Sequence, residues 1–427
     1  MTVLGRSRQQ LTFLAHRAAL WGAAAFGDPG ARLVRRSTED PYPLYEDIRA
    51  QAPVVRSRIG IHASASYAVA ARVLRDDRFG MRDPHAPELV RPGTEPVHPI
   101  EDSFLMMDPP EHTRLRRLAA PYFTARAVQR RADLVEQVVR TCLDEFGDTE
   151  RVDLVPMFAN RVPVQVICDL LGVPEPEHER FRGWANRIAP AFDGVNSVGE
   201  HERLRRVMVE LQEFFTELIA FRRRHPAEDI LSGLVHATVD GESLSTHELL
   251  ATSGLLLLAG FGTTVNLIGK GVLGVLTHPQ ARSGLLHDPG LASAVVEETL
   301  RFDPPVHLTA RFAHQDVDLD GHLVRRGEQL VLSLAGANRD PAVFSHPDQF
   351  DPSRPNARDH LAFSGGIHFC VGAALARMEA EVALRALFQR HPDLELAGPV
   401  RRGDGRTLPM LTSLPVHCPR PAASSAA

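Results

Sequence analysis

The residue best placed to do chemistry is Cys370, in the run FSGGIHFCVG from Phe363 to Gly372. A sulfur that ligates haem iron must be held as a thiolate, shielded from oxidation and aimed by a stiff turn. Gly365 and Gly366 predict such a turn, with positive φ and a close approach to the macrocycle. Gly372 is small enough for a helix expected at residues 371–390 to pass against the porphyrin. Cys370 is therefore expected at a helix N-terminus, which favours the thiolate.

Other roles for Cys370 have to be weighed. A buried structural cysteine behind a glycine-rich turn is the commoner case for an isolated cysteine. A zinc site that uses His368 and Cys370 fails, because no second ligand pair stands at a suitable spacing. A nucleophilic thiol in hydrolysis also lacks support. The motifs described below favour the haem thiolate over the structural role.

The pattern Phe-x-x-Gly-x-His-x-Cys-x-Gly, continued by Leu375-Ala376-Arg377, resembles the haem signature of the cytochrome P-450 superfamily. The resemblance extends from about residue 40 to residue 418. It implies a mainly α fold with small β-sheets, in which the haem lies between a long central helix and the cysteine loop. It also implies that Cys370 ligates the iron of heme b (iron protoporphyrin IX) and that four neighbours border the cofactor, namely Phe363, Gly366, His368 and Gly372.

Glu298 and Arg301 stand three residues apart in a predicted helix, so they share one face and can pair. With the following FDPP segment they resemble the Glu-x-x-Arg helix of the superfamily, and Arg354 matches the further arginine that braces it. An exposed helix pair is the alternative, and it would contribute only about 0.2–0.5 kcal/mol. The resemblance favours a structural triad.

The resemblance also implies partners for the two haem propionates, which need cationic or hydrogen-bonding groups when the macrocycle is buried. His112 and Arg116 stand four residues apart, so they lie on one face of a predicted helix. Arg311 follows two consecutive prolines, and His368 stands two residues before Cys370. Each of them alone is more often a solvated surface residue, and the matched positions favour the propionate role.

The segment AGFGTT, from Ala259 to Thr264, resembles the oxygen-binding stretch of the superfamily. The usual acid is missing because Gly262 occupies its position, while Thr263 keeps the hydroxyl expected beside dioxygen. Two glycines in a helix cost about 1 kcal/mol each relative to alanine, so a dioxygen groove or close helix packing is expected. The catalytic candidates are Thr263, Thr264 and Gly262, and the candidates for cofactor contact are Ala259 and Gly260.

By resemblance, the chain is a soluble bacterial-type haem-thiolate monooxygenase. It is expected to hydroxylate or epoxidise a lipophilic small molecule in natural-product biosynthesis, with electrons from a separate ferredoxin or flavodoxin and its reductase. Acidic donors of this kind would dock on exposed arginines. The candidates are Arg114, Arg117, Arg126, Arg130 and Arg131. Substrate contacts are expected from Leu256, Ala259, Val306, Leu308, Thr309 and Met410.

Two alternatives stay open. The first alternative is atypical chemistry, such as oxidative coupling or peroxide-driven turnover, because Gly262 replaces the usual acid. An alternative from another class is a P-450-like helper that activates a glycosyltransferase and performs no oxidation. Such helpers lack the cysteine or other haem residues, so Cys370, His368 and Arg311 argue against that role.

Bulk properties are those of a large globular protein. The 427 residues are 44% apolar and 24% charged, which predicts a single domain at 36–419, a helical extension at 1–35 and a disordered tail at 420–427. The four cysteines are scattered and show no spacing that suggests disulfide pairs, which is expected of a protein in the reducing cytoplasm. The net charge of −5 gives no sign of a nucleic-acid partner. A monomer is expected.

No membrane anchor is expected. Residues 11–26 are interrupted by His16 and Arg17 and predict an amphipathic helix, and residues 254–276 predict a buried core helix.

Helical periodicity dominates, and strand-like runs are few. Helices are expected at residues 41–51, 65–76, 112–120, 125–146, 162–171, 177–189, 199–225, 246–276 and 289–302. Strands are expected at 54–61, 306–312, 317–324, 329–334 and 408–416, and long loops at 79–101 and 189–198.

Overall fold

The computed structural model describes residues 14–15, 17–86, 95–146, 149–188, 192–194, 197–239 and 241–419. The tail predicted at residues 420–427 lies outside these ranges, as do residues 1–13 of the N-terminal extension and parts of both predicted loops. Within the described part of the extension, residues 17–25 are helical.

Helices are the main regular structure of the described chain, as the sequence predicts. They are α2 (Pro29–Val34), α3 (Tyr42–Gln51), α4 (Tyr67–Val73), α5 (Glu111–Ala119), α6 (Ala125–Gln129), α7 (Ala132–Asp144), α8 (Arg161–Leu171), α9 (His178–Ile188), α10 (Val198–Arg224), α11 (Ile230–His236), α12 (Thr246–Thr277), α13 (Pro279–His287), α14 (Ala292–Phe302), α15 (Leu334–Ala337) and α16 (Ala373–Arg390). Short 3-10 turns include η2 (Ala120–Phe123) and η8 (Gly366–His368).

The strands form small sheets. A five-stranded sheet has the order β1 (Val55–Arg56), β2 (Ile61–Ser64), β10 (Gln329–Ser333), β7 (Leu308–Ala313) and β3 (Phe79–Gly80). In it, β2 and β10 are parallel and the other pairs are antiparallel. The remaining strands are β4 (Arg151–Asp153), β5 (Thr238–Val239), β6 (Glu242–Ser243), β8 (Val317–Leu319), β9 (His322–Val324), β11 (Glu395–Leu396), β12 (Arg401–Arg402), β13 (Leu411–Ser413) and β14 (Pro415–His417).

Some element predictions were wrong. The helix expected at residues 125–146 is broken into α6 and α7 at Arg130 and Arg131, where Arg131 leaves helical geometry. The strand expected at 317–324 is a hairpin, β8 and β9. The short helices α11 and α13 and the three-residue strand β4 were missed, because such short segments carry little periodicity.

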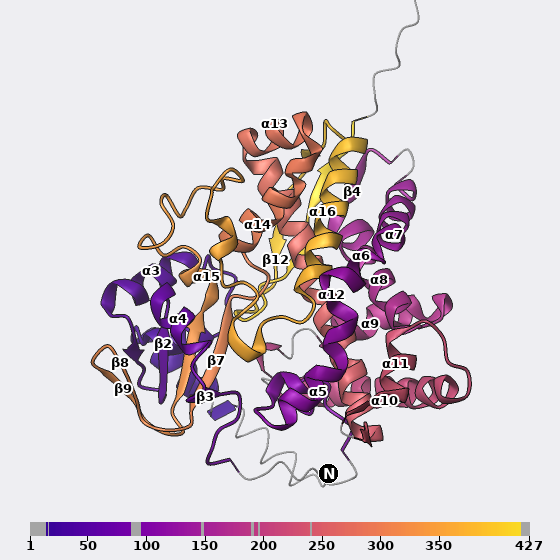
Figure 1. Cartoon of the computed structure of the whole chain (residues 1–427). Helices are drawn as coiled ribbons and strands as arrows, with labels where there is room; N and C mark the ends of the chain where they lie inside the picture. Colours follow the sequence, from indigo (N-terminus) through magenta and orange to yellow (C-terminus); the bar gives the residue numbers. More distant parts are fainter. Residues whose placement is uncertain are drawn as a thin grey trace, which may run out of the picture.

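The helix α12 runs through the centre of the molecule. The sheet with α3 and α4 lies to its left in Figure 1, α6 to α11 lie to its right, and α5 lies below it. A capping box of Ser245 and Glu248 begins the helix. It is long and apolar enough to span a membrane by length and composition alone, but 83% of its most apolar window is buried. It is therefore a core helix, packed against α8 and α16.

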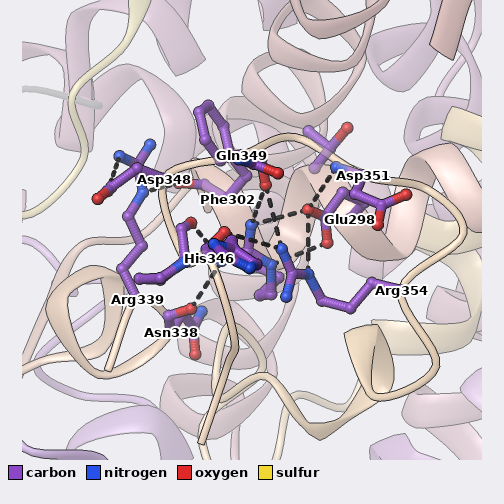
Figure 2. A network of polar contacts seen from close by, with 12 residues as sticks. Glu298, Phe302, Asn338, Arg339, His346, Asp348, Gln349, Asp351 and Arg354 are labelled. Atoms are coloured by element: carbon purple, nitrogen blue, oxygen red, sulfur yellow. Dashed lines mark hydrogen bonds and ion pairs between the residues drawn. The ribbon is translucent and has the colours of Figure 1, made fainter. Parts of the chain in front are cut away.

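A buried ionic cluster holds the chain beside α14. Two hydrogen bonds, of 2.8 and 2.7 Å, join the guanidinium of Arg301 to the Glu298 carboxylate, and Arg354 Nε lies 3.5 Å from the same carboxylate. The two arginines also donate to backbone carbonyls, including Pro347 and Gln349 (Figure 2). Glu298 and Arg301 are fully buried. The triad of Glu298, Arg301 and Arg354 thus holds the irregular segment around Pro347 and Gln349, which precedes the cysteine loop, against α14.

Glu298→Gln is expected to destabilise the fold by about 3–5 kcal/mol, because it leaves two buried guanidinium groups without a counter-charge. Denaturant unfolding measures the change. Glu179→Gln, at an exposed helix pair with Arg182, is the control that should change little. Equal stabilities of the two variants would contradict this role for Glu298.

Candidate active site

The turn before Cys370 requires glycine at one position. Gly366 has φ of +63°, and a Cβ there would lie 2.3 Å from the carbonyl oxygen of Leu74. The prediction of positive φ at Gly365 was wrong: Gly365 is extended, at −157°, and Ser364 adopts the second positive φ, at +63°. The backbone N–H of Cys370 donates to the Phe363 carbonyl at 2.9 Å, which closes the loop.

The pKa of the Cys370 thiol is raised, whereas its position near a helix N-terminus predicts that it is lowered. Burial raises the pKa of this thiol, while the Gly372 backbone N–H and the charges of Arg116 and Arg377 lower it by less. The expected contribution from this end of the helix is present in the Gly372 N–H, but it is smaller than the effect of burial. The helix α16 begins at Ala373, three residues after Cys370.

Cys370 opens onto a hollow of about 500 Å³ between α5, η2 and α16. Its other lining residues are Arg116, Ala120, Phe123, Thr124, Glu297, Arg358, Phe369, Val371, Ala373, Ala374 and Arg377. None of the six residues predicted to contact substrate is among them. The hollow therefore belongs to the cysteine side of the site.

The four predicted propionate partners gather around the loop. The rings of His112 and His368 lie 4.3 Å apart between centroids. Arg311 reaches Ser364 Oγ at 3.4 Å, and Arg116 donates to the carbonyl of Phe369. Burial lowers the pKa of Arg311 to about 10, and burial with nearby positive charges lowers the pKa of His368 to about 3. These shifts show a crowded, positively charged environment.

This environment fits an anionic macrocycle. Within the described residues, neither Arg116 nor Arg311 forms an ion pair with a carboxylate. Both ring nitrogens of buried His112 and the Nε2 of His368 also lack a partner. Buried cations and donors without acceptors are costly. A group with two carboxylates would satisfy them, and Cys370 would supply the sulfur ligand, so the residues fit haem.

The stretch predicted to bind dioxygen, residues 259–264, interrupts the burial of α12. Residues on either side are buried, but Ala259 is exposed and Gly260 and Thr263 are half-buried. The Thr263 hydroxyl donates to the Ala259 carbonyl at 2.7 Å, and Thr264 is buried. The helix therefore presents Ala259 and Thr263 on a surface that the protein leaves uncovered.

The two glycines of this stretch differ. A Cβ on Gly260 would lie 3.3 Å from Ile167 of α8, so close helix packing explains that glycine. A Cβ on Gly262 would make only ordinary contacts, the nearest at 3.5 Å from Leu408 and 3.8 Å from Met410. Packing therefore does not require glycine at 262, and Gly262 adjoins Met410, one of the predicted substrate residues.

The predicted substrate residues do not all share one surface. Arg311 donates to Thr309 Oγ1 at 3.0 Å, so Thr309 and Arg311 lie on the same face of β7. Leu308 alternates to the other face, where it packs with Leu44 and Ile48 of α3. The structure thus places Leu308 in a core, away from Thr309. Val306 is half-buried and Leu256 is buried.

A polar network missed by the sequence analysis positions these segments. Asn266, fully buried on α12, donates to the Pro409 carbonyl and accepts from the Leu411 N–H, each at 3.0 Å. One turn later, Lys270 Nζ lies 2.8 Å from Asp303 Oδ1 and 2.9 Å from the Pro304 carbonyl. Polar residues spaced by four in an apolar helix were the available signal.

Asp303 is the centre of this network. Burial alone would raise the pKa of Asp303. The positive charges of Lys270 and Arg402 and a hydrogen bond from His307, at 3.0 Å, instead hold this pKa well below its ordinary value. Because Asp303 accepts from Nε2 of His307, the Nδ1 accepts from the Tyr45 hydroxyl, at 3.0 Å. The neutral His307 thus anchors the chain between α14 and β7.

The predicted arginine docking face is divided. Arg114 pairs with Glu248 at the start of α12, so it links α5 to that helix and is not free for a partner. Arg131 donates to the Glu228 carbonyl at 3.2 Å. Arg117, Arg126 and Arg130 are exposed.

Gly366→Ala is expected to cost more than about 2 kcal/mol of stability, because the new Cβ meets a backbone oxygen in a left-handed conformation. Gly372→Ala is the matched control, since a Cβ there meets no atom within 4 Å. Thermal unfolding of both variants provides the comparison. Equal melting temperatures would contradict the steric requirement at Gly366.

His307 predicts a pH dependence of stability. Burial, and then the charge of Lys270, lower the pKa of His307 to about 4, against about 6.5 when unfolded. Between these values the unfolded chain binds the proton and the folded chain does not, so stability falls as the pH drops from about 6.5 to 4, by roughly 3 kcal/mol. His307→Gln should flatten this slope, and His287→Gln, at an exposed histidine, should not. Unfolding curves at several pH values measure it, and an unchanged slope in His307→Gln would refute the assignment.

Comparisons with known proteins agree with this geometry. A family model described as cytochrome P450 matches residues 290–395. The Mycobacterium tuberculosis protein named cytochrome P-450 140 is 39% identical, over 96% of this chain and 97% of that protein. The cytochrome P-450 monooxygenase PikC of Streptomyces venezuelae is also 39% identical, over 84% of this chain and 85% of PikC.

Solved structures are similar over nearly the whole chain. The crystal structure of P-450 BioI in complex with hexadec-9Z-enoic acid ligated acyl carrier protein has a TM-score of 0.84 and 34% identity, covering 89% of this chain and 99% of that one. The P-450 PksS of the Bacillus subtilis bacillaene polyketide synthase has a TM-score of 0.82 and 32% identity, covering 89% of this chain and 97% of that one. The chain therefore belongs to the cytochrome P-450 family of monooxygenases, whose cofactor is heme b.

Proposed function

We propose that this protein inserts one oxygen atom into a lipophilic small molecule of natural-product biosynthesis, by hydroxylation or epoxidation. The observation that carries the proposal is that Cys370 lies near two cations, the buried Arg311 and the half-buried Arg116, which lack carboxylate partners in the described chain. For hydroxylation the balance is R–H + O2 + two electrons + two protons giving R–OH + H2O. When bound, heme b supplies the activation of dioxygen, which thiolate ligation favours.

The protein's own residues supply position and protons. Ala259 and Thr263 line the uncovered surface of α12, next to Gly262 and Met410. The Thr263 hydroxyl donates its hydrogen bond to the Ala259 carbonyl. To donate to a molecule on the uncovered surface of α12, the hydroxyl must rotate about its side-chain bond. With Gly262 in place of an acid, protons reach Thr263 through water or through a hydroxyl of the substrate.

The substrate class is supported by the relatives and by the residues of the site. PikC is a monooxygenase, and a Bacillus subtilis relative, 37% identical over 71% of this chain, is named for polyketide biosynthesis. The predicted contacts Leu256, Ala259, Val306 and Met410 are apolar and suit a molecule of that type. Thr309 adds a hydroxyl on the face of β7 that bears Arg311.

Electrons are proposed to come from a separate ferredoxin or flavodoxin with its reductase. The hollow beside Cys370 is flanked by Arg116, Arg358 and Arg377, and the Arg358 side chain is 76% exposed. Arg117 and Arg126 add exposed positive charge on α5 and α6. An acidic donor would be attracted to this side of the protein.

The first test is the carbon-monoxide difference spectrum of the dithionite-reduced protein. A strongly red-shifted Soret band is expected, because thiolate ligation by Cys370 produces it. Cys370→Ser should abolish the band, and Cys418→Ser, at a buried cysteine in a different part of the fold, should keep it. Well-folded protein without haem would overturn the monooxygenase proposal and favour the non-catalytic helper.

A further inference from the structure

A buried carboxylate, Glu297, gathers positive groups behind the cysteine loop. It lies on α14 and is 4% exposed. Arg377 of α16 donates to it twice, from Nε to Oε1 at 2.6 Å and from Nη2 to Oε2 at 3.3 Å. His360 Nε2 lies 3.1 Å from Oε2, and Arg358 Nε lies 4.0 Å from Oε1. Two helices and the chain before the cysteine loop therefore meet at one carboxylate.

Glu297 stays ionised in this position. Burial opposes its charge, but hydrogen bonds from His360 and Arg377 lower the pKa of Glu297 to about 2. The Nδ1 of His360 accepts from the Ala362 N–H at 3.3 Å, so its Nε2 carries the proton and donates to Glu297. Glu297 is therefore a permanent counter-charge that holds the Arg377 guanidinium in one place.

The guanidinium of Arg377 is held beside Cys370. The Ala373 N–H donates to the Cys370 carbonyl at 3.4 Å, and Arg377 follows Ala373 by one helical turn on the same face of α16. The guanidinium carbon lies 4.5 Å from the centroid of the Phe363 ring, and the Phe363 carbonyl accepts from the Cys370 N–H at 2.9 Å. Burial raises the pKa of the Cys370 thiol and the charge of Arg377 opposes this, so the field of the guanidinium reaches the sulfur.

We propose that Arg377 raises the reduction potential of the iron that Cys370 would ligate, and that Glu297 is the residue that positions it. The inference rests on the proposed ligation by Cys370. Reduction adds an electron to the iron and its sulfur ligand, and a positive charge fixed nearby stabilises the added negative charge. Stacking on Phe363 keeps the guanidinium from turning into water, which would screen its charge. A higher potential makes the first electron easier to accept from a separate donor protein.

A purely structural role is the alternative, because the same ion pair joins α14 to α16. The two roles differ in what a substitution changes. Loss of a helix contact lowers stability, whereas loss of a nearby charge also lowers the reduction potential. The helix α16 offers a matched control in Arg385, two turns further along, which pairs with Glu136 at 3.1 Å. The side chains of Arg377 and Arg385 are 32% and 33% exposed, so they differ mainly in their distance from Cys370.

The test is a spectroelectrochemical titration of the haem-loaded full chain with mediator dyes and without a donor protein. Arg377→Gln is expected to reduce the equilibrium constant for reduction about tenfold, which lowers the potential by about 59 mV. Arg377→Lys keeps the charge and should recover most of this loss. Arg385→Gln should leave the potential close to that of the parent. An unchanged potential in Arg377→Gln, or an equal fall in Arg385→Gln, would overturn the proposal.

A second variant covers the case in which Arg377→Gln fails to fold, since that change leaves Glu297 without its main partner. Glu297→Gln with Arg377→Gln removes both charges, and its potential should still fall, because Arg377 is the member of the pair whose charge affects the pKa of Cys370. An unchanged potential in this double variant would likewise count against the proposal. The carbon-monoxide spectrum separates the two levels. A parent without the red-shifted band would refute ligation by Cys370 and this inference with it, whereas a parent with the band and variants of unchanged potential would refute the inference alone.

Discussion

The energetic cost of burying charge decides the arrangement of this protein. Three buried carboxylates of the framework are each paired with at least one cation. Glu298 binds Arg301 and Arg354, Asp303 binds Lys270 and Arg402, and Glu297 binds Arg377. Another solution is protonation: burial without a partner raises the pKa of Glu379 well above its ordinary value, so its carboxyl stays neutral. Both solutions follow from the cost of an unpaired charge in a medium of low polarity.

Against that background the surroundings of Cys370 are different. Arg311 is buried without a carboxylate among the described residues, and two histidine rings keep unpaired nitrogens. The pKa of the Cys370 thiol is itself raised by the surrounding protein. Heme b would relieve these costs together, because carboxylates of the cofactor would accept hydrogen bonds from these donors and Cys370 would supply a thiolate ligand to its iron. Cofactor binding should therefore contribute to the stability of the fold as well as to its chemistry.

The central helix connects this framework to the site. Its buried polar residues, Asn266 and Lys270, fasten the segments around Pro409 and Pro304. Those segments carry the substrate candidates Met410 and Val306. Glu248, at the first turn of the same helix, pairs with Arg114 of α5, the helix that carries Arg116. One helix thus sets the relative positions of residues 259–264, of the segments that carry the substrate candidates and of α5, which carries the propionate candidates His112 and Arg116.

The sequence by itself determined the family, the cysteine ligand, the mainly helical class and the order of the long helices. Those features rest on local spacing: glycines around Cys370, a pair three residues apart at Glu298 and Arg301, and long apolar periodicity. Tertiary structure decided the positive φ at Ser364 in place of Gly365, the net pKa of Cys370, the burial of Leu308 in a separate core and the pairing of Arg114. It also decided the Asp303 network, which joins Tyr45, Lys270, the segment from Asp303 to His307, and Arg402, four segments that are distant in the chain. Local patterns predict what a residue can do, but desolvation and partner choice depend on neighbours that are distant in the chain.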